Sequence, residues 1–460
     1  MPRIATLSLT IIASSLLFAQ SHADYIEGPF DSPQEVTETC FMCHEDAATD
    51  FMKTRHWNWS GDEFEAEGRG TVALGKKNLI NNFCISVPTN YPRCTSCHAG
   101  YGWKDETFDF EDPNNVDCLV CHETSGTYKK TPTGAGMPSE ESDLVAAAQS
   151  VGTPTRANCG VCHFDGGGGT GVKHADMDDA ILDADENLDV HMGGLGFECV
   201  DCHAADAHDI KGASHGSMMQ NTGHFSCLEC HDTELHSKPT INKHVAHVAC
   251  ETCHVPEIAR GLPTKTWWDW SKAGMDLEVT HDQYGKELFA KKKGEFKWAK
   301  NIQPEYYWHN GGADYYFIGD KIDPTETVKL NTLRGDIDDP DSRIYPFKVM
   351  RGKQPYDAIN NHLGTPHLFG KDGFWNTFDW AQSLTIGLEA VGLEFSGEYD
   401  FVETEMYWPV NHTVAPAENA VKCTECHGSG SRLDWIALGY AGDPMREGTR
   451  EDLGLIKAGK

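Results

Sequence analysis

The sequence predicts a mainly α-helical chain with much irregular structure, wrapped around a cluster of bound groups rather than folded around a sheet. Three observations point this way. Sixteen of the 17 cysteines fall in eight copies of one short motif. Seven copies crowd residues 40–254. The mature chain holds only about 55 residues per copy, so the bound groups themselves must make up much of the core.

The first 23 residues read as a secretory signal peptide. One early arginine precedes an apolar run from Ile4 to Ala19, and residues 21–23 form a small-x-small end, which predicts cleavage after Ala23. A membrane anchor is the alternative, but the run is short and rich in Ser and Thr. We therefore expect an exported, periplasmic protein without a transmembrane segment after cleavage.

The repeated motif is Cys-x-x-Cys-His. Two thiols three positions apart can add to the two vinyl groups of one haem, and the next imidazole then reaches the iron as proximal ligand. Zinc ribbons and disulfides are the alternatives, but neither needs a histidine directly after the second cysteine. The pattern predicts eight covalently bound haem c groups. The copies are Cys40-Cys43-His44, Cys94-Cys97-His98, Cys118-Cys121-His122, Cys159-Cys162-His163, Cys199-Cys202-His203, Cys227-Cys230-His231, Cys250-Cys253-His254 and Cys423-Cys426-His427.

The motifs divide the mature chain into a haem-rich region (24–255), a haem-free, aromatic-rich segment with helices (256–422) and a C-terminal haem-binding segment (423–460). In the haem-free segment, aromatic clusters at 266–270 and 304–317 are most simply explained as packing. An apolar stripe at helical spacing predicts a helix within residues 376–393.

Histidines outside the motifs can supply the second, distal iron ligands. Fourteen remain in the expected mature chain, more than eight irons need, so counting does not reveal an open iron. Closeness to the motifs selects eight candidates, each with a surface or haem-edge position as its alternative. They are His56, His208, His215, His224, His236, His244, His247 and His412.

The net charge of −32 argues against a nucleic-acid partner and suits a basic electron-donor protein. Within an acidic cluster at residues 176–189, DADENLD begins like a calcium-binding loop. It has Leu188 where the loop needs glycine and Gly194 where it needs the closing glutamate. The sequence therefore leaves open whether the protein binds a structural calcium ion.

Two features have no part in haem attachment. Cys84, ten residues before Cys94, is either buried and inert or kept for chemistry. Four consecutive glycines (166–169) and then Gly171 precede Lys173 and His174. Glycine lets backbone approach a flat cofactor, and a neutral lysine amine can bind iron. A flexible loop with a solvated lysine is the alternative.

The order of the eight motifs, the isolated last motif, Cys84 and the GGGGTGVKH loop together resemble the octahaem tetrathionate reductases of respiratory bacteria, over essentially the whole mature chain. That family is similar in haem packing to hydroxylamine oxidoreductase and pentahaem nitrite reductase, although the CxxCK variant of the latter is absent here. The resemblance implies a catalytic haem held by Cys94, Cys97 and His98, with Lys173 as its distal ligand and Cys84 in its pocket.

The activity that the resemblance implies is reductive cleavage of tetrathionate to thiosulfate at this haem, supplied with electrons by the seven others and by a redox-protein donor. Reduction of nitrite or hydroxylamine at the same lysine-ligated iron is a second enzymatic hypothesis. A non-catalytic electron-transfer conduit with every iron saturated is the third.

Overall fold

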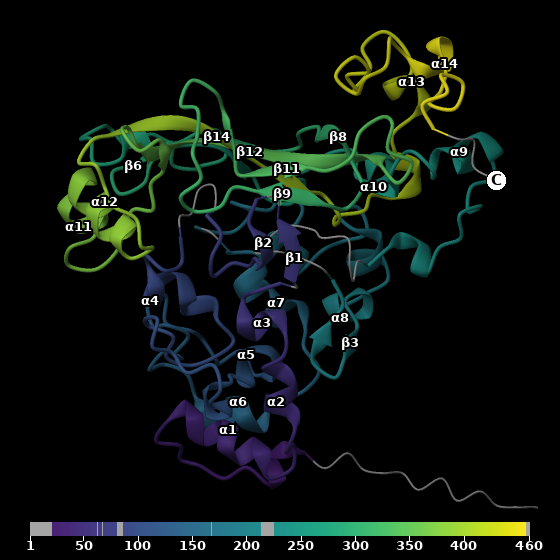
Figure 1. Ribbon diagram of the computed structural model, residues 1–460. Helices are drawn as coiled ribbons and strands as arrows, with labels where there is room; N and C mark the ends of the chain where they lie inside the picture. Colours follow the sequence, from purple (N-terminus) through teal and green to yellow (C-terminus); the bar gives the residue numbers. More distant parts are fainter. Residues whose placement is uncertain are drawn as a thin grey trace, which may run out of the picture.

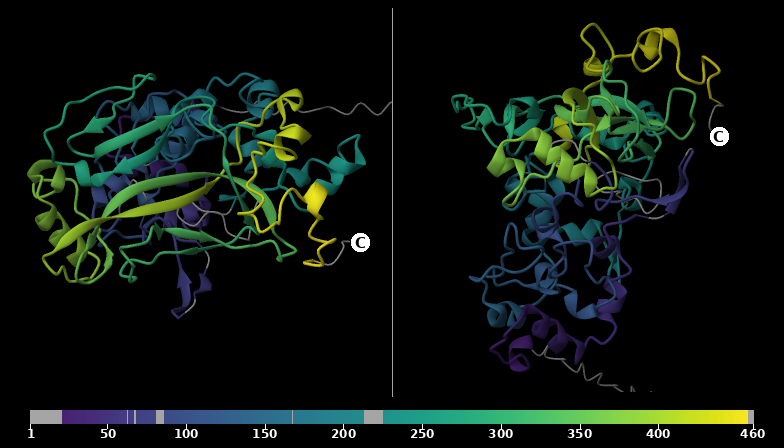
Figure 2. Two further views of the ribbon diagram at one scale, coloured as in Figure 1. Left: turned by 90° about the horizontal axis from the view of Figure 1, so that it is seen from above. Right: turned by 60° about the vertical axis from the view of Figure 1, so that its left-hand side comes forward.

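The computed structural model describes residues 21–61, 63–66, 68–80, 86–166, 168–212 and 225–456. Short helices and loops of the N-terminal half form a column, and the haem-free segment forms a layer across its top (Figure 1). The segment that carries the last motif lies at one end of this layer, near the helix that ends at His244 (Figures 1 and 2).

The helices are short, and most of those in the column contain or adjoin a motif. One helical turn places residues three apart on the same side, so the two cysteines of a motif face the same group. Helix α10 coincides with a complete motif, and α5, α8 and α13 each span four of the five motif residues. The described α-helices are α1 (Pro33–Phe41), α2 (Ala47–Phe51), α3 (Arg55–Asn58), α4 (Tyr91–Cys94), α5 (Leu119–His122), α6 (Leu144–Gln149), α7 (Arg156–His163), α8 (Cys199–Cys202), α9 (Pro239–His244), α10 (Cys250–His254), α11 (Phe374–Thr377), α12 (Trp380–Glu389), α13 (Cys423–Cys426) and α14 (Pro444–Glu447).

The top layer is an eight-stranded sheet with the order β10-β14-β12-β5-β7-β6, and β8 and β13 also pair with β12. Three smaller two-stranded sheets are β1-β2, β3-β4 and β9-β11. The strands are β1 (Glu63–Ala66), β2 (Gly70–Ala73), β3 (Ala205–Asp206), β4 (Asp209–Ile210), β5 (Thr264–Asp269), β6 (Phe289–Ala290), β7 (Gly294–Ala299), β8 (Glu305–His309), β9 (Ala313–Tyr315), β10 (Val328–Lys329), β11 (Asn331–Leu333), β12 (Arg343–Asp357), β13 (His362–Leu363) and β14 (Tyr399–Pro409).

Strand β12 is the centre of the sheet. It runs antiparallel to β14 from the pair Phe347 and Pro409 to the pair Asp357 and Tyr399. It also pairs in parallel with β5 and antiparallel with β8. Seen from above, its long ribbon and that of β14 cross the top of the column (Figure 2).

The sheet and the column share one hydrophobic core. Trp268, Met350 and Trp408 of the sheet are buried in the same cluster as Leu79 and Val172 from the N-terminal half. Since burying apolar surface is the main favourable term in folding, this cluster holds the haem-free layer against the haem-rich column.

The expectation of a mainly α chain is met only in part. The helix expected within 376–393 is present as α12, with Trp380, Leu384 and Leu388 buried. The rest of the haem-free segment is dominated by strands. Strand β12 is buried along most of its length on both faces, so the alternation that usually marks a strand is weak in its sequence.

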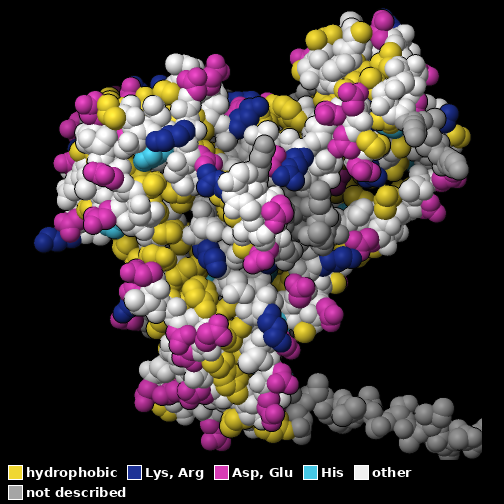
Figure 3. Space-filling view, in the orientation of Figure 1, with side chains coloured by type: hydrophobic (Ala, Val, Ile, Leu, Met, Phe, Trp, Pro, Cys, Tyr) yellow, Lys and Arg dark blue, Asp and Glu magenta, His cyan; other side chains and the backbone are white. Residues whose placement is uncertain are grey.

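Among the residues described, no helix is both long and apolar enough to cross a membrane. Aspartate and glutamate side chains are spread over both the layer and the column on the face seen in Figure 3, as the net charge of −32 leads one to expect.

Candidate functional site

Seven of the eight motif histidines each face one other histidine, with ring centroids 6.1 to 6.4 Å apart. The partner histidine always lies outside the motifs, and in most pairs it is distant in the sequence from the motif histidine that it faces. The pairs are His44 with His22, His122 with His208, His163 with His56, His203 with His412, His231 with His191, His254 with His236 and His427 with His244.

This spacing fits a metal ion between the two rings. Two imidazoles that bind opposite sides of one ion through nitrogens about 2 Å from it hold their centroids about 6 Å apart. Direct stacking of aromatic rings can be closer, yet all seven separations lie within this narrow range. The residues present therefore fit haem iron held between each pair.

Hydrogen bonds at Nδ1 orient several of these rings. The Nδ1 of His122 lies 2.9 Å from the Gly152 carbonyl oxygen, and that of His203 lies 2.9 Å from the Lys211 carbonyl oxygen. The Nδ1 of His427 lies 2.7 Å from an Asp443 carboxylate oxygen. Because carbonyl and carboxylate oxygens only accept, Nδ1 carries the proton and Nε2 is left free to bind a metal.

The motifs also adjoin one another in a continuous series. The thiol of Cys40 in the first motif lies against that of Cys118 in the third, and Cys159 of the fourth lies against Cys199 of the fifth. The thiols of Cys227 and Cys250 join the sixth and seventh motifs in the same way, and those of Cys97 and Cys162 join the second motif to the fourth. The remaining neighbours are near enough for their thiols to interact electrostatically: Cys121 with Cys159, Cys202 with Cys230 and Cys253 with Cys426.

The described cysteines form no disulfide with one another. Groups attached to these motifs would thus lie in a row in the order first, third, fourth, fifth, sixth, seventh and eighth, with the second as a branch beside the fourth. Such a row can carry electrons from one end of the molecule to the branch.

The structure brings five of the predicted distal ligands opposite a motif histidine: His56, His208, His236, His244 and His412. It does not do so for His247, whose Nε2 instead lies 2.8 Å from a carboxylate oxygen of Glu451. His215, His224 and Cys84 lie outside the described residues.

Two paired histidines were missed from the sequence. His191 lies eight residues before Cys199, and Asp189 caps the turn that carries it by accepting from its backbone N–H across 2.8 Å. His22 was assigned to the signal peptide. Proximity to a motif in the sequence does not say which histidine ring the fold brings opposite a motif histidine.

His98, in the second motif, is arranged differently. Its ring is fully buried, and no second histidine faces it among the residues that the structure describes. Its Nε2 donates to the Trp57 carbonyl oxygen across 2.7 Å. Burial, with Lys130 and Lys76 nearby, lowers the pKa of His98 to about 3, so the ring is neutral. An aromatic shell surrounds it, composed of Trp57, Trp59, Trp103, Phe108 and Phe110.

At the end of the glycine-rich loop, Gly171, Val172 and Lys173 are buried, so this lysine is not the solvated side chain of the alternative. The loop begins where α7 ends, and Cys162 of that helix contacts Cys97 of the second motif. Gly171 has a φ of +67°, a conformation that favours glycine. Lys173 is only 5% exposed, and its Nζ lies 5.7 Å from the centre of the Trp408 ring.

The sheet holds this loop at its backbone. The Nζ of Lys348, on β12, donates to the carbonyl oxygens of Val172 and Lys173 across 2.7 and 2.8 Å. Thr264 Oγ1, on β5, donates to the Gly171 carbonyl oxygen across 2.7 Å. Burial lowers the pKa of Lys348 well below its usual value.

The haem-free segment also holds the stretch just before the second motif. Asn90 Nδ2 donates to the Pro366 carbonyl oxygen across 3.1 Å, and its Oδ1 accepts from the Leu368 N–H across 2.7 Å. The His367 Nδ1 lies 2.7 Å from the Thr89 carbonyl oxygen. Residues 86–90 and the Lys173 loop are therefore both held by residues 256–422.

The calcium hypothesis gains no support. Within the described ranges no group of three or more His, Cys, Asp or Glu side chains could hold a metal ion. Asp189 accepts from the backbone of His191, Met192 and Val414. The guanidinium of Arg260 donates to the Leu188 carbonyl oxygen across 3.1 Å.

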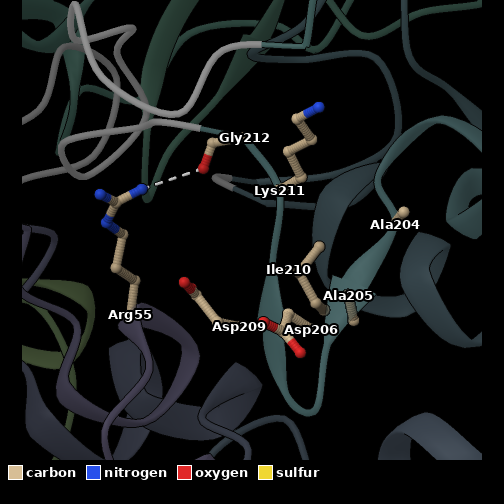
Figure 4. A pocket seen from close by; sticks show the side chains of 8 residues that line it. All are labelled: Arg55, Ala204, Ala205, Asp206, Asp209, Ile210, Lys211 and Gly212. Atoms are coloured by element: carbon tan, nitrogen blue, oxygen red, sulfur yellow. Dashed lines mark hydrogen bonds between the residues drawn. The ribbon is translucent and has the colours of Figure 1, made fainter.

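A cavity of about 370 Å³ follows the fifth motif (Figure 4). It is lined by residues 204–206 and 209–212 around the β3-β4 hairpin and by Arg55, which donates to the Gly212 carbonyl oxygen across 3.0 Å. The same stretch contacts the His203 ring and carries His208, so we associate this space with the haem sites there and not with His98.

Comparison with known proteins agrees with this architecture. The family model "Cytochrome c554 and c-prime" matches residues 39–123, and "Cytochrome c bacterial" matches residues 265–430. The crystal structure of octaheme cytochrome c from Shewanella oneidensis is 50% identical, with a TM-score of 0.88, over 92% of this chain and 98% of that one. An uncharacterized protein of Archaeoglobus fulgidus is 24% identical over 38% of this chain and 75% of its own length.

Proposed function

The chain belongs to the octahaem c-type cytochromes of the tetrathionate reductase family, and on that premise we propose that it reduces tetrathionate to thiosulfate at the haem attached to Cys94 and Cys97. It binds haem c covalently and takes part in redox chemistry. In the proposal, eight haems are bound, the seven histidine pairs hold seven of the irons, and Lys173 is the distal ligand of the eighth.

The observation that carries the proposal is the contrast between His98 and the other motif histidines. Seven irons held between two imidazoles have no free position, which suits electron transfer. His98 faces no such partner in the described part of the chain, so this iron is the one available for substrate. For His98 to hold this iron through Nε2, its ring would have to release the hydrogen bond to the Trp57 carbonyl oxygen.

The Lys173 loop supports the same position. It leaves the fourth motif, which contacts the second motif through Cys162 and Cys97. Burial disfavours a charged amine, and a neutral amine can bind iron. The bonds from Lys348 and Thr264 hold the loop backbone, so the approach of the side chain is determined by the sheet rather than by a mobile loop.

The charges near His98 suit a dianionic substrate. Lys76 and Lys130 both lie close enough to lower the pKa of the His98 imidazole. Lys130 is paired with Asp117 across 2.8 Å, whereas the Nζ of Lys76 lies 4.1 Å over the Trp59 ring of the aromatic shell. In a chain of net charge −32, this local positive charge would attract an anion that the rest of the surface repels.

Two electrons delivered to tetrathionate break its central S–S bond and leave two thiosulfate dianions, and no proton is consumed. Bound haem supplies the electrons. Lys173 would either leave the iron to admit substrate or, when protonated, balance the negative charge of a sulfonate. Cys84 would contact the sulfur chain, because a thiolate attacks S–S bonds directly. The shell of aromatic side chains excludes water from the site.

Electrons reach the site along the row of motifs in this proposal. The donor is a basic redox protein that meets the acidic surface, and the location is the periplasm. Reduction of nitrite or hydroxylamine at the same haem is the alternative activity, and a saturated electron-transfer conduit is the alternative without catalysis.

The experiment that tests the proposal is Lys173→Leu in the holoprotein, with exposed Lys129→Leu as the matched control. We expect K173L to change the absorption spectrum of one haem and to lower tetrathionate turnover with a viologen donor at least tenfold, while K129L changes neither. Parallel assays with nitrite and hydroxylamine identify the preferred acceptor. Unchanged spectrum and turnover in K173L would falsify the lysine assignment. If the wild type reduces none of these acceptors, both enzymatic proposals fail and the non-catalytic electron-transfer conduit is the remaining function.

A further inference from the structure

We propose that His22 is the second axial ligand of the iron at the first motif, and that the mature chain consequently begins at or before His22 rather than at Asp24. The inference rests on the covalent attachment of haem to Cys40 and Cys43, but not on which substrate the protein reduces.

The first observation is the position of the His22 ring. Its centroid lies 6.3 Å from that of His44, and the two ring planes differ by 25°. The other six histidine pairs span 6.1 to 6.4 Å, so this pair has the separation that fits an iron between two imidazoles. His44 would otherwise be left without a histidine partner among the described residues.

The second observation is that the chain around His22 is fixed to the first motif. His22 is the first residue of a short 3-10 helix, His22–Asp24. The carbonyl oxygen of His22 accepts a hydrogen bond from the N–H of Ile26 across 3.0 Å. Ile26 is buried against Ala147 of α6 and Val36 of α1, the helix that carries Cys40.

A side-chain hydrogen bond adds to this packing. Gln149, at the end of α6, donates from Nε2 to the Ile26 carbonyl oxygen across 2.8 Å. A free N-terminus usually frays unless such contacts hold it. These contacts leave only three residues between the buried Ile26 and His22, so the ring has little freedom to leave the first motif.

The sequence offers a signal-peptidase site that keeps this residue. Ala19-Gln20-Ser21 has the small-x-small pattern of a cleavage site, and so does the overlapping stretch of residues 21–23. Cleavage after Ser21 would make His22 the first residue of the mature protein. Cleavage after Ala23, the site expected from the sequence alone, would remove the ring. Haem ligation and processing are therefore linked at one residue.

Intact-mass spectrometry of the exported wild-type holoprotein tests the processing directly. We expect a mature chain that starts at His22 or upstream of it. A mature chain that starts at Asp24 would overturn the proposal, whatever the outcome of the tetrathionate assays.

The ligand itself is tested by His22→Ala, with the exposed His281→Ala as the matched control, and each N-terminus is read from its mass. In H22A we expect one more high-spin haem per chain and the uptake of one more carbon monoxide per reduced chain than in the wild type. Added imidazole should restore the low-spin spectrum. If H22A has the same high-spin content and carbon monoxide uptake as H281A, His22 is not the ligand.

Discussion

The Nζ of Lys348, a residue that is only 2% exposed, lies 2.8 Å from the carbonyl oxygen of Lys173. One lysine of the sheet thus holds the backbone of another lysine that lies in the glycine-rich loop. The contact joins the haem-free segment to the haem-rich column at the site where we place catalysis. It also gives that segment a function beyond packing, namely to position the loop.

We expect Lys348→Met to release the carbonyl oxygens of Val172 and Lys173. A buried acceptor without a donor costs about 1 to 3 kcal/mol, so the loop should lose its fixed position. Tetrathionate turnover should fall about tenfold, and the spectrum of the haem to which we assign Lys173 as ligand should change. Lys353→Met, on the same strand, is the control. A lower turnover without any spectral change would show that Lys348 does not act through Lys173.

The sheet itself could not be predicted from the sequence in the way that the motifs could. Haem attachment depends on residues three positions apart, which are visible in the sequence. Strand β12 depends on β14, β5 and β8, which follow or precede it by tens of residues. Its buried side chains on both faces also remove the alternation that would have marked it.

The histidine pairs give a discriminating prediction at the eighth motif. His244 faces His427 at 6.1 Å, whereas His247 lies 2.8 Å from Glu451, although both were candidates on sequence spacing. We expect His244→Ala to convert one haem to the high-spin state and His247→Ala to leave every haem unchanged. Electron paramagnetic resonance of the oxidised proteins measures this difference. The opposite result would reassign the distal ligand.

The pairing of these ligands was beyond sequence reasoning for a physical reason. Proximity along the chain suggested His244 and His247 equally, since the two lie three residues apart, and only the ring of His244 faces His427. His191 reaches His231 from 40 positions earlier in the sequence. An axial ligand is selected by where the fold places a ring, and short-range spacing carries that information only for the motif histidine.

Lys76 is predicted to act on substrate binding. Its ammonium lies over Trp59 in the shell around His98, so Lys76→Gln should remove one positive charge from the approach of a dianion. We expect the KM for tetrathionate to rise about three- to tenfold with a smaller change in kcat, and the effect to shrink at high salt. Lys104→Gln, on an exposed residue, is the control. An equal effect of both substitutions would point to net charge alone.

The acid stability of the sheet should depend on Asp357, at the end of β12. Its carboxylate is fully buried and accepts from the N–H groups of Asn360 and Ser396, both at 2.7 Å. Burial alone would raise the pKa of Asp357, but these bonds and the Ser396 hydroxyl outweigh it and lower the pKa to about 2.

Because the folded pKa lies below the unfolded value of about 3.9, the carboxylate stabilises the protein above that value, and the contribution is lost as the pH falls towards 2. Asp357→Asn should lower the free energy of unfolding by about 2 kcal/mol at neutral pH and should lack this loss between about pH 4 and pH 2. Guanidinium midpoints followed by circular dichroism at several pH values measure both effects, with exposed Asp400→Asn as the control. If D357N and D400N have the same midpoints at neutral pH, the buried carboxylate does not stabilise the end of β12.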